Sequence, residues 1–378
     1  MEPVHRAIAA CAQFELHLAV TGMHLLPQFA SSLEQVRADR LGNLHEVKFG
    51  LDEGTAYAMT RSTGHELIAF AELVDRLSPD ILLVQGDRGE MLAAAIAAAN
   101  ANVAIVHMSG GDFSGSIDDS VRNAISKFAH IHLTNCDAST RRLIAMGESA
   151  DRIVEVGDPA IDQLRTMNFL PLSELGPALN LDSAKPFLIA TLHPVTDEAS
   201  QAAAQMTILL EALDEIDMTT VFTYPNSDAG GTDMRSVLES WRGRRFLRIV
   251  ANLGSWRYLS LLRHAAAMVG NSSSGIIEAP ALRIPAVNIG SRQHNRLRAD
   301  NVIDIPCKRE AIVKAVRLVL GDPEFRRKLR SCYSPYGDGH AAERTLHVLL
   351  RLKLGNALIA KWRQAPAGSF LTASTNGI

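Results

Sequence analysis

The sequence has few cysteines, no excess of basic residues and no long apolar run. Its four cysteines, Cys11, Cys136, Cys307 and Cys332, lie far apart and form no CxxC pair. This spacing indicates neither a zinc site nor a disulfide framework, and it favours free thiols in a reducing compartment. A formal net charge of −3 offers no basic surface to nucleic acid. No stretch reaches the length of a membrane-spanning helix, and no apolar signal segment follows Met1. We therefore expect a cytoplasmic protein with neither a membrane nor a nucleic-acid partner.

Short apolar runs alternate with longer amphipathic stretches along the 378 residues, of which 47% are hydrophobic. A chain of this length is expected to form two domains. Runs rich in branched aliphatic residues and bounded by Gly, Pro or polar residues are typical of parallel strands buried on both faces. The predicted strands are 15–21, 81–85, 103–107, 130–134 and 153–156, followed by 187–192, 219–223, 246–250, 267–270 and 286–289.

Predicted helices separate these strands, at 63–77, 89–100, 120–128, 137–146, 199–214, 255–264, 274–281 and 309–320. This alternation predicts an α/β protein with two doubly wound sheets. A Leu-, Pro- and Ser-rich stretch at 162–183 interrupts it, so we place one domain at 1–165 and the other at 166–340. A helix at 341–356 is expected to pack back on the first domain, and the small, polar tail at 365–378 is expected to be disordered.

The beginning of the chain departs from the usual order of such domains. Doubly wound domains open with a strand and a turn, whereas Met1 here leads directly into a predicted helix at 2–12. The first strand of the first domain, and the turn where ligands dock, are therefore expected to be missing. We expect the coding region to start upstream of Met1, and the chain from Met1 to carry an exposed apolar groove in its first sheet and weak or absent activity.

Two clusters of chemically capable residues follow strands of the first series, where this architecture binds ligands. Asp87 comes directly after the strand 81–85 and is either a general acid/base or the N-cap of the next helix. The second cluster begins with paired glycines at 110–111, which allow a ligand to approach the backbone. It is either a binding site or a helix start with a local Asp–Arg pair, and comprises Asp112, Asp118, Asp119 and Arg122.

Three further clusters follow strands of the second series. His193 is held by the proline after it. It either donates a hydrogen bond to a phosphate or moves a proton, or it is a structural histidine. The Ser/Gly turn at 270–275 offers hydroxyl and N–H groups at a helix start, which suits a diphosphate, although it lacks the GKS or GKT ending of a P-loop. The alternative is an ordinary serine cap. Arg292 pairs with a phosphate or a carboxylate, or else lies in a solvated loop.

No single cluster is enough to suggest a protein family, but the order of the motifs along the chain resembles that of a known one. The series TGMH, GDR, SGGD, SIDDSVRNAISK, TLHP, TYPNSDAGG, GNSSSGIIEAP, SRQ and YGDG resembles the hydrolysing UDP-N-acetylglucosamine 2-epimerase family. The resemblance covers residues 2–354, and the branch that it most resembles supplies sialic and related nonulosonic acids such as legionaminic acid.

The resemblance implies the GT-B architecture, two Rossmann-like domains with a central cleft, and a small-molecule UDP-sugar substrate. It implies elimination of UDP, addition of water and inversion at C2, without a metal or cofactor, in a homodimer or homotetramer. By matching motifs, the implied catalytic residues are Asp87, Asp112, Asp119 and His193. The implied substrate- and UDP-binding residues are His24, Arg122, Tyr224, Asn271, Ser272, Ser273, Gly275, Glu278 and Arg292.

The sequence also departs from the family pattern. The first strand with its Gly-Thr-Arg type of turn is absent, Ser109 stands where many relatives have Glu or His, and Asn295 stands where relatives have Gly. Two rival functions therefore stay open beside the epimerase. One is a GT-B glycosyltransferase, which shares the fold and the nucleotide cleft. The other is a degenerate sugar-nucleotide-binding protein without turnover.

Overall fold

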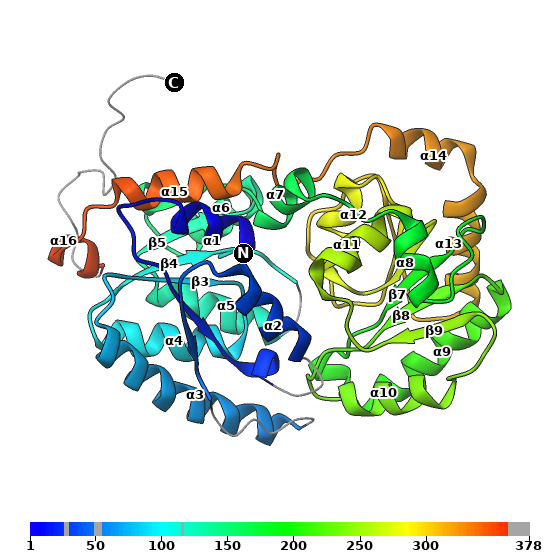
Figure 1. Cartoon of the computed structure of the whole chain (residues 1–378), viewed down its shortest axis with the longest axis horizontal. Coiled ribbons are helices and arrows are strands. Elements are labelled where there is room, and N and C mark those ends of the chain that lie inside the picture. Colours follow the sequence, from blue (N-terminus) through cyan, green and yellow to red (C-terminus); the bar gives the residue numbers. More distant parts are fainter. Residues whose placement is uncertain (26–29, 49–54, 115–116, 362–378) are drawn as a thin grey trace.

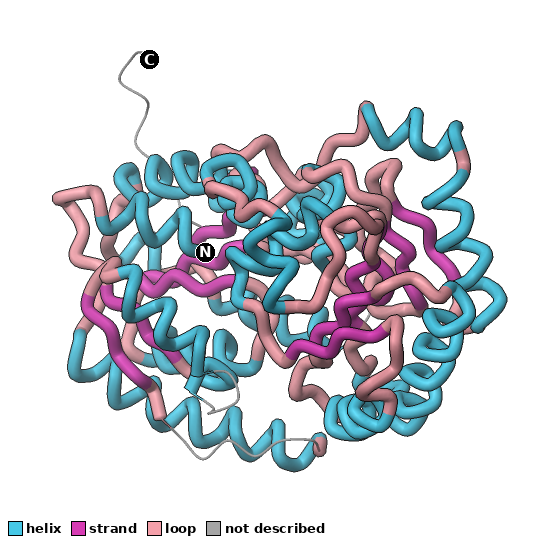
Figure 2. Tube along the Cα trace, turned by 45° about the vertical axis from the view of Figure 1, so that its right-hand side comes forward, coloured by secondary structure: helices cyan, strands magenta, loops and turns pink. Residues whose placement is uncertain are grey.

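The computed structural model describes residues 1–25, 30–48, 55–114 and 117–361, which form two α/β domains joined side by side (Figure 1). The N-terminal domain is built on β1–β6 and the C-terminal domain on β7–β12. Every strand pairing is parallel. Figure 2 shows helices on both sides of the strands in each domain, and the predicted α/β class is confirmed.

The strands of the N-terminal domain fall into two separate sets. β1 (His17–Val20) pairs with β2 (Asn43–Glu46), and the other set has the order β3-β4-β5-β6. Among the described residues, no strand links β1 to β3. β3 is only partly buried, whereas every residue of β4 and β5 is buried, as expected for strands inside a covered sheet. The second set comprises β3 (Ile81–Gln85), β4 (Ala104–Met108), β5 (Ile131–Thr134) and β6 (Ile153–Glu155).

The N-terminal helices cover this sheet, and the alanine-rich α4 (Gly89–Asn100) lies closest to its centre. Its buried alanines pack among Phe70, Leu73 and Val74 of α3 (Ala56–Leu77), because small side chains allow a close approach between helices. The other helices before β6 are α1 (Glu2–Ala9), α2 (Ala30–Asp39), α5 (Ile117–Phe128) and α6 (Asp137–Ala145).

The C-terminal domain has one six-stranded sheet with the order β12-β11-β10-β7-β8-β9. The chain leaves β7 first to one side and then to the other, so the topological switch point lies between β7 and β10. Ligands of open parallel sheets bind at such a point, beyond the carboxyl ends of the strands. The strands are β7 (Leu188–Thr191), β8 (Thr220–Thr223), β9 (Leu247–Val250), β10 (Ala267–Gly270), β11 (Ala286–Ile289) and β12 (Val302–Ile305).

Two hydrophobic clusters cover the two faces of this sheet. One gathers around Met206, Leu209 and Leu213 of α9 (Ala202–Ile216), and the other around Leu261 and Leu262 of α11 (Gly254–His264). The remaining helices of the domain are α8 (Leu172–Ala178), α10 (Gly231–Ser240), α12 (Glu278–Ala281), α13 (Arg309–Gly321) and α14 (Pro323–Arg330).

Two segments cross between the domains. The first contains α7 (Pro159–Thr166), and the second leads back into α15 (Ala341–Arg351) and α16 (Asn356–Ile359), which lie over the N-terminal domain (Figure 1). The carboxylate of Asp162 accepts hydrogen bonds from the N–H groups of Ala341 (2.9 Å) and Ala342 (2.7 Å), which caps the start of α15. Val348 and Leu349 of α15 then share a core cluster with Val4 of α1.

The structure differs from the sequence-based expectation at several elements. The helix predicted at 274–281 is broken into a short 3₁₀ turn, η5 (Ser273–Gly275), and α12. Pro280 explains the break, because proline lacks the N–H that would bond to Ile276 and its ring clashes with that turn. β2, β12, α2, α7, α8, α10, α14 and α16 were not predicted.

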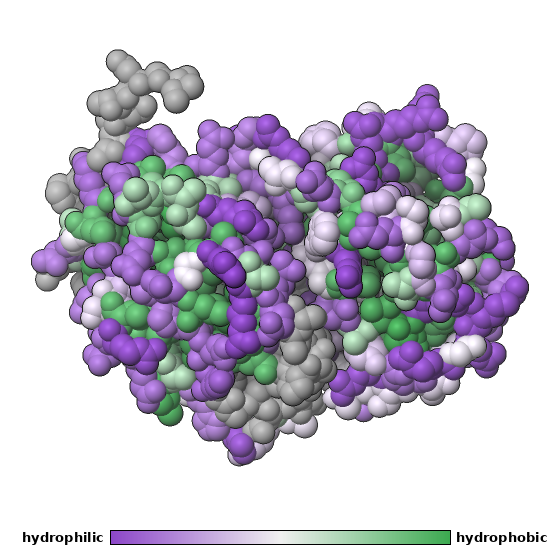
Figure 3. All heavy atoms as spheres, viewed as in Figure 1, coloured by the Kyte–Doolittle hydropathy of each residue, from purple (hydrophilic) through white to green (hydrophobic). Residues whose placement is uncertain are grey.

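The outer surface mixes hydrophilic and hydrophobic residues over both domains (Figure 3). Within the described ranges, no helix combines the length and apolar character needed to cross a bilayer. The tail predicted to be disordered at 365–378 lies outside the described residues.

Candidate functional site

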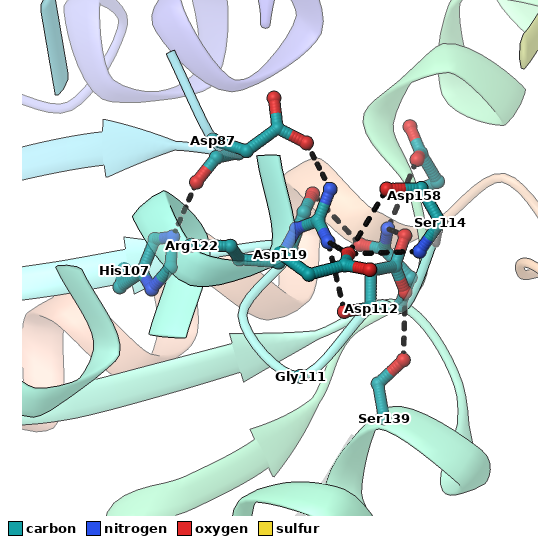
Figure 4. Close-up of polar contacts among 12 residues, drawn as sticks. Asp87, His107, Gly111, Asp112, Ser114, Asp119, Arg122, Ser139 and Asp158 are labelled. Carbon is teal, nitrogen blue, oxygen red and sulfur yellow. Dashed lines mark hydrogen bonds and ion pairs between the residues drawn. The ribbon is translucent and has the colours of Figure 1, made fainter. Parts of the chain in front are cut away.

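Arg122 on α5 is the centre of a carboxylate cluster in the N-terminal domain (Figure 4). Its side chain is 1% exposed, and Nη2 pairs with Asp87 just beyond β3. Nη1 donates to Asp119 Oδ1 at 2.5 Å and to the carbonyl of Asp112 at 2.9 Å. Burial opposes the charge, but Asp87, Asp112 and Asp119 together raise the pKa of Arg122. The sequence left helix capping open for Asp87, whereas Arg88 holds that position in α4 and Asp87 faces Arg122.

The carboxylate of Asp119 has two more donors. Ser114 gives it both its N–H (2.8 Å) and its hydroxyl (2.9 Å). Three donors from two residues therefore converge on Oδ1 of a buried carboxylate. This arrangement stabilises the ionised form and fixes the direction of the group.

Asp112 belongs to a second, connected hydrogen-bond network. Its Oδ1 accepts from the Ser139 hydroxyl at 2.7 Å, and its Oδ2 lies 3.4 Å from Nδ2 of Asn135. The same Nδ2 donates to Asp158 at 3.1 Å, and the Ser109 hydroxyl donates to Oδ1 of Asn135 at 3.1 Å. Burial raises the pKa of Asp158, with Asp112 adding to the effect. Asn135 thus links two buried carboxyl groups, and Ser109 orients Asn135.

His107 on β4 supports the turn that carries Asp87. One ring nitrogen lies 2.9 Å from the carbonyl of Gly86 and the other lies 3.0 Å from the hydroxyl of Ser126. Because a carbonyl can only accept, Nε2 carries the hydrogen and Nδ1 accepts from Ser126. Burial lowers the pKa of His107 to about 3, so the ring stays neutral and rigidly holds the backbone before Asp87.

His193 follows β7 in the C-terminal domain, at the switch point of the sheet. Its Nδ1 accepts the N–H of Asn226 at 3.1 Å, so the neutral ring carries its hydrogen on Nε2. Burial, together with Arg292 and Arg88, lowers the pKa of His193 to about 3. The side chain therefore offers a fixed N–H donor, but it does not carry a titratable proton near neutral pH.

The loop after β10 fixes the backbone of His193. Asn271 accepts from the His193 N–H at 2.7 Å and donates to its carbonyl at 2.8 Å. Gly270 makes this possible, because a Cβ at its φ of 137° would lie 1.9 Å from the carbonyl oxygen of Thr191. Arg292 Nη1 donates to the carbonyl of Asn271 at 3.3 Å, so Arg292 is held at the site and does not lie in a solvated loop.

The two domains meet at an ion pair beside these groups. Arg88 Nη1 lies 3.0 Å from Asp228 Oδ1, and Asp228 follows β8 in the C-terminal domain. Arg292 interacts electrostatically with Asp118, Asp228 and Asp87, which belong to both domains. Contacts through Arg88, Asp228 and Asn226 therefore connect the turn that carries Asp87 with His193 where the two domains meet.

Glu278 and Arg296 are neighbours that carry buried polar atoms without a partner. Oε2 of Glu278 and Nε and Nη1 of Arg296 are buried without a hydrogen-bond partner. Burial, together with Asp158, raises the pKa of Glu278 to about 7, while Arg296 opposes the rise. Unpaired buried donors and acceptors of this kind suit a polar ligand. No role was predicted for Arg296 from the sequence, and the orphaned atoms are visible only in the folded structure.

The serine-rich turn lies close to Glu278, as its position in the sequence requires. Ser272 accepts the N–H of Ser274 at 3.3 Å and so acts as the serine cap that was one of the two interpretations. Ser273 is partly exposed, and the Cβ position of Gly275 would lie 3.3 Å from Ala286. Glycine at that position allows the turn to lie directly against β11.

Two further predicted site residues, Tyr224 and His24, have neighbours of their own. The Tyr224 hydroxyl binds Glu239 on α10 at 2.5 Å, within the C-terminal domain. His24 lies in the 3₁₀ helix η1 (Gly22–Leu25), where burial lowers its pKa and Glu90 opposes the effect.

Comparison with known proteins gives the family. Residues 6–350 match the family model described as UDP-N-acetylglucosamine 2-epimerase. The UDP-N,N'-diacetylbacillosamine 2-epimerase (hydrolyzing) of Legionella pneumophila is 34% identical over 361 residues, covering 96% of this chain and 94% of the relative. The GDP/UDP-N,N'-diacetylbacillosamine 2-epimerase (hydrolyzing) of Campylobacter jejuni is 33% identical, covering 76% of each chain.

Solved structures agree on the fold. An S. aureus MnaA–UDP co-structure superimposes with a TM-score of 0.78 at 18% identity, covering 92% of both chains. The UDP-GlcNAc 2-epimerase from Neisseria meningitidis bound to UDP-GlcNAc gives 0.77 at 15% identity, covering 92% of this chain and 96% of the other. The architecture is GT-B-like, as predicted, and the chain belongs to the UDP-N-acetylglucosamine 2-epimerase family.

Proposed function

We propose that this chain is a hydrolysing 2-epimerase that converts a UDP-linked 2-acetamido sugar into UDP and the free 2-epimeric sugar. The observation that carries the proposal is the pairing of a fixed carboxylate cluster on one domain with a fixed N–H donor on the other. Asp87 and Asp119 are held by Arg122, and His193 is linked to the Asp87 turn through Asn226, Asp228 and Arg88. Family membership and the names of the relatives support the same reaction.

The proposed chemistry is an elimination followed by an addition. One carboxylate of the Asp87 and Asp119 pair removes the C2 proton while the C1–O bond breaks and its electron pair leaves with UDP. Water then adds its hydroxyl to C1, and a proton returns to C2 from the opposite face. Because no step transfers a hydride, the sequence of steps does not call on a nicotinamide.

The C-terminal domain is proposed to bind the leaving group. His193 would donate its Nε2–H to a phosphate oxygen, and Arg292 would supply positive charge beside it. The turn at Ser272, Ser273 and Gly275 would hold the diphosphate, and Glu278 would accept from ribose hydroxyls. The carboxamide of Asn271 is proposed to act on the ligand through His193, because both of its ends bind the His193 backbone.

The structure favours a positioning role for Arg122. Sequence matching placed it among the substrate-binding residues, yet its side chain is 1% exposed and both terminal nitrogens are engaged. We therefore propose that Arg122 sets the spacing and orientation of Asp87 and Asp119. For the sugar, we propose the 2,4-diacetamido-trideoxy class, because the two relatives described above carry that substrate in their names.

Turnover in D₂O separates this proposal from its rivals. UDP-N-acetylglucosamine and UDP-N,N'-diacetylbacillosamine are each incubated with the chain, and UDP release and the NMR spectrum of the sugar are followed. The proposal expects free sugar of inverted C2 configuration carrying one deuterium at C2. Free sugar that keeps its C2 proton would contradict it, sugar linked to an acceptor would indicate a glycosyltransferase, and UDP binding without turnover would indicate a degenerate binder.

Size-exclusion chromatography with light scattering tests the proposed assembly, which is a homodimer or homotetramer. It is an independent proposal, since the chemistry above is assigned to residues of one chain.

A further inference from the structure

Arg88 and Asp228 belong to different domains and are separated by 140 residues of sequence. Arg88 is the N-cap residue of α4, and Asp228 lies in the loop between β8 and α10. Nη1 and Oδ1 are 3.0 Å apart, and the side chain of Asp228 is 9% exposed. The pair therefore joins the two domains and is partly shielded from water.

Each partner is connected to a proposed site residue. Arg88 is the peptide neighbour of Asp87, whose carboxylate pairs with Arg122. On the other side, Nδ2 of Asn226 donates to Asp228, and the N–H of Asn226 donates to Nδ1 of His193 at 3.1 Å. A continuous set of contacts thus runs from Asp87 in the N-terminal domain to His193 in the C-terminal domain.

The loop that carries Asp228 is tightly folded. The N–H of Gly231 donates to the Asp228 carbonyl at 2.8 Å. A Cβ at Gly231 would lie 2.3 Å from the carbonyl oxygen of Asn226, so only glycine allows this loop to close on itself. A displacement of Asp228 would therefore also move Asn226, and Asn226 orients the ring of His193.

Arg88 keeps its charge in this position and remains within reach of water. Burial opposes ionisation, but Glu90 and Asp228 raise the pKa of Arg88. The Arg88 side chain is nevertheless 42% exposed. A pair of this exposure adds modest stability, which suits a contact that forms and breaks as two domains close and open.

We propose that the Arg88–Asp228 pair is an interdomain latch, and that both residues are positioning residues that place Asp87 and His193 on opposite sides of the substrate. This inference rests on the proposed reaction. That reaction requires a protein base beside the sugar and a protein hydrogen-bond donor beside the diphosphate at the same time. The distance between the domains sets that geometry, and small errors in it are costly to rate.

A double-mutant cycle tests the latch. Arg88→Gln and Asp228→Asn are each expected to lower kcat/KM about tenfold, through a higher KM as well as a lower kcat, because less of the protein is closed. The double variant should lose no more than either single variant, and Arg88→Lys should recover much of the activity. Arg245→Gln, which removes an exposed pair with Asp217 on the outside of the C-terminal domain, is the matched control.

Small-angle X-ray scattering of the same variants tests the latch without turnover. The radius of gyration of ligand-free Arg88→Gln and Asp228→Asn should exceed that of the unchanged protein, and saturating UDP-glucose should reduce the difference. This measurement stays informative if the proposed reaction is wrong. Losses that multiply to about a hundredfold in the double variant, or scattering identical in all variants, would overturn the latch.

Discussion

The carboxamide of Asn271 binds both backbone groups of His193, accepting from its N–H at 2.7 Å and donating to its carbonyl at 2.8 Å. The loops after β7 and β10 are thereby joined at the switch point of the C-terminal sheet. His193 is thus oriented by Asn271 through its backbone and by Asn226 through its ring. The proposed donor to the leaving group has little freedom before substrate binds.

Replacing Asn271 should therefore impair the same step as replacing His193. Asn271→Ala is expected to lower kcat about a hundredfold, because two hydrogen bonds that hold the donor are lost. The double variant with His193→Ala should be hardly slower than His193→Ala alone, since residues that act as a unit are not additive. Steady-state kinetics give both numbers. Multiplicative losses would mean that Asn271 acts independently of His193.

Arg122 should be needed for turnover but not for binding of the nucleotide. In Arg122→Met, the carboxylates of Asp87 and Asp119 lose the buried cation that holds them in place. We expect kcat to fall about a hundredfold, because a misplaced base is costly to rate, and the affinity for UDP-glucose to stay unchanged. Arg141→Met, which removes an exposed pair with Asp137 on α6, serves as the control. A matching loss of UDP-glucose affinity, measured by calorimetry, would contradict the assigned positioning role.

The buried carboxyl group of Glu278 should make ligand binding depend on pH near neutrality. Burial and Asp158 raise the pKa of Glu278 to about 7, so the group is mostly ionised above that pH and mostly neutral below it. If the carboxylate accepts from ribose hydroxyls, UDP-glucose affinity should fall as pH drops from 8 to 6. Isothermal titration calorimetry measures this, and UDP-glucose has no phosphate group that titrates in the range. The Glu278→Gln variant should show a flat profile, and an equal slope in both proteins would contradict the assignment.

Ser109 stands where many relatives have an acid/base residue, but its hydroxyl donates to Asn135 at 3.1 Å. We expect Ser109→Ala to lower kcat/KM by no more than about fivefold, the cost of one neutral hydrogen bond. Asn135→Ala should cost more, because it removes the donor shared by Asp112 and Asp158. A hundredfold loss in Ser109→Ala would instead give Ser109 a direct part in proton transfer.

Glu148 should contribute to stability in a pH-dependent way. Its carboxylate is 1% exposed and binds Lys127 (2.9 Å), His132 (3.1 Å) and Lys361 (2.5 Å). Burial alone would raise its pKa, but these three donors lower the pKa of Glu148 to about 2. Glu148→Gln should therefore lower the free energy of unfolding by about 3 kcal/mol at pH 7.

The direction of this pH dependence follows from the lowered pKa of Glu148. The Glu148 contribution is complete above its unfolded-state pKa of 4.5 and is lost as pH falls through about 2. Urea unfolding of both proteins between pH 7 and 2.5 should show the difference shrinking below pH 4.5. Glu343→Gln, which removes an exposed contact with His340, is the control. A difference that does not change with pH would show that packing, and not ionisation, explains the loss.

The sequence by itself determined the α/β class, the family and the positions of the reactive side chains. Strand and helix patterns are local, so β3, β10 and β11 were predicted with their observed bounds, and Asp87 was predicted to follow a strand. Parallel strands place their carboxyl ends together, so His193 and Asn271 were also predicted at a ligand-binding edge. The helix predicted at 274–281 is broken in the structure, because Pro280 removes an N–H that a continuous helix needs.

Only the tertiary structure decided what each of these groups contacts. Asn271 was matched to the ligand, yet its carboxamide is occupied by His193, and Arg122 is enclosed by carboxylates. The Arg88–Asp228 contact joins residues 140 positions apart. Which residues meet there depends on how the two separately folded sheets face each other. Local pattern records which face of an element is buried, but the distance and direction between two elements depend on the packing of every side chain between them.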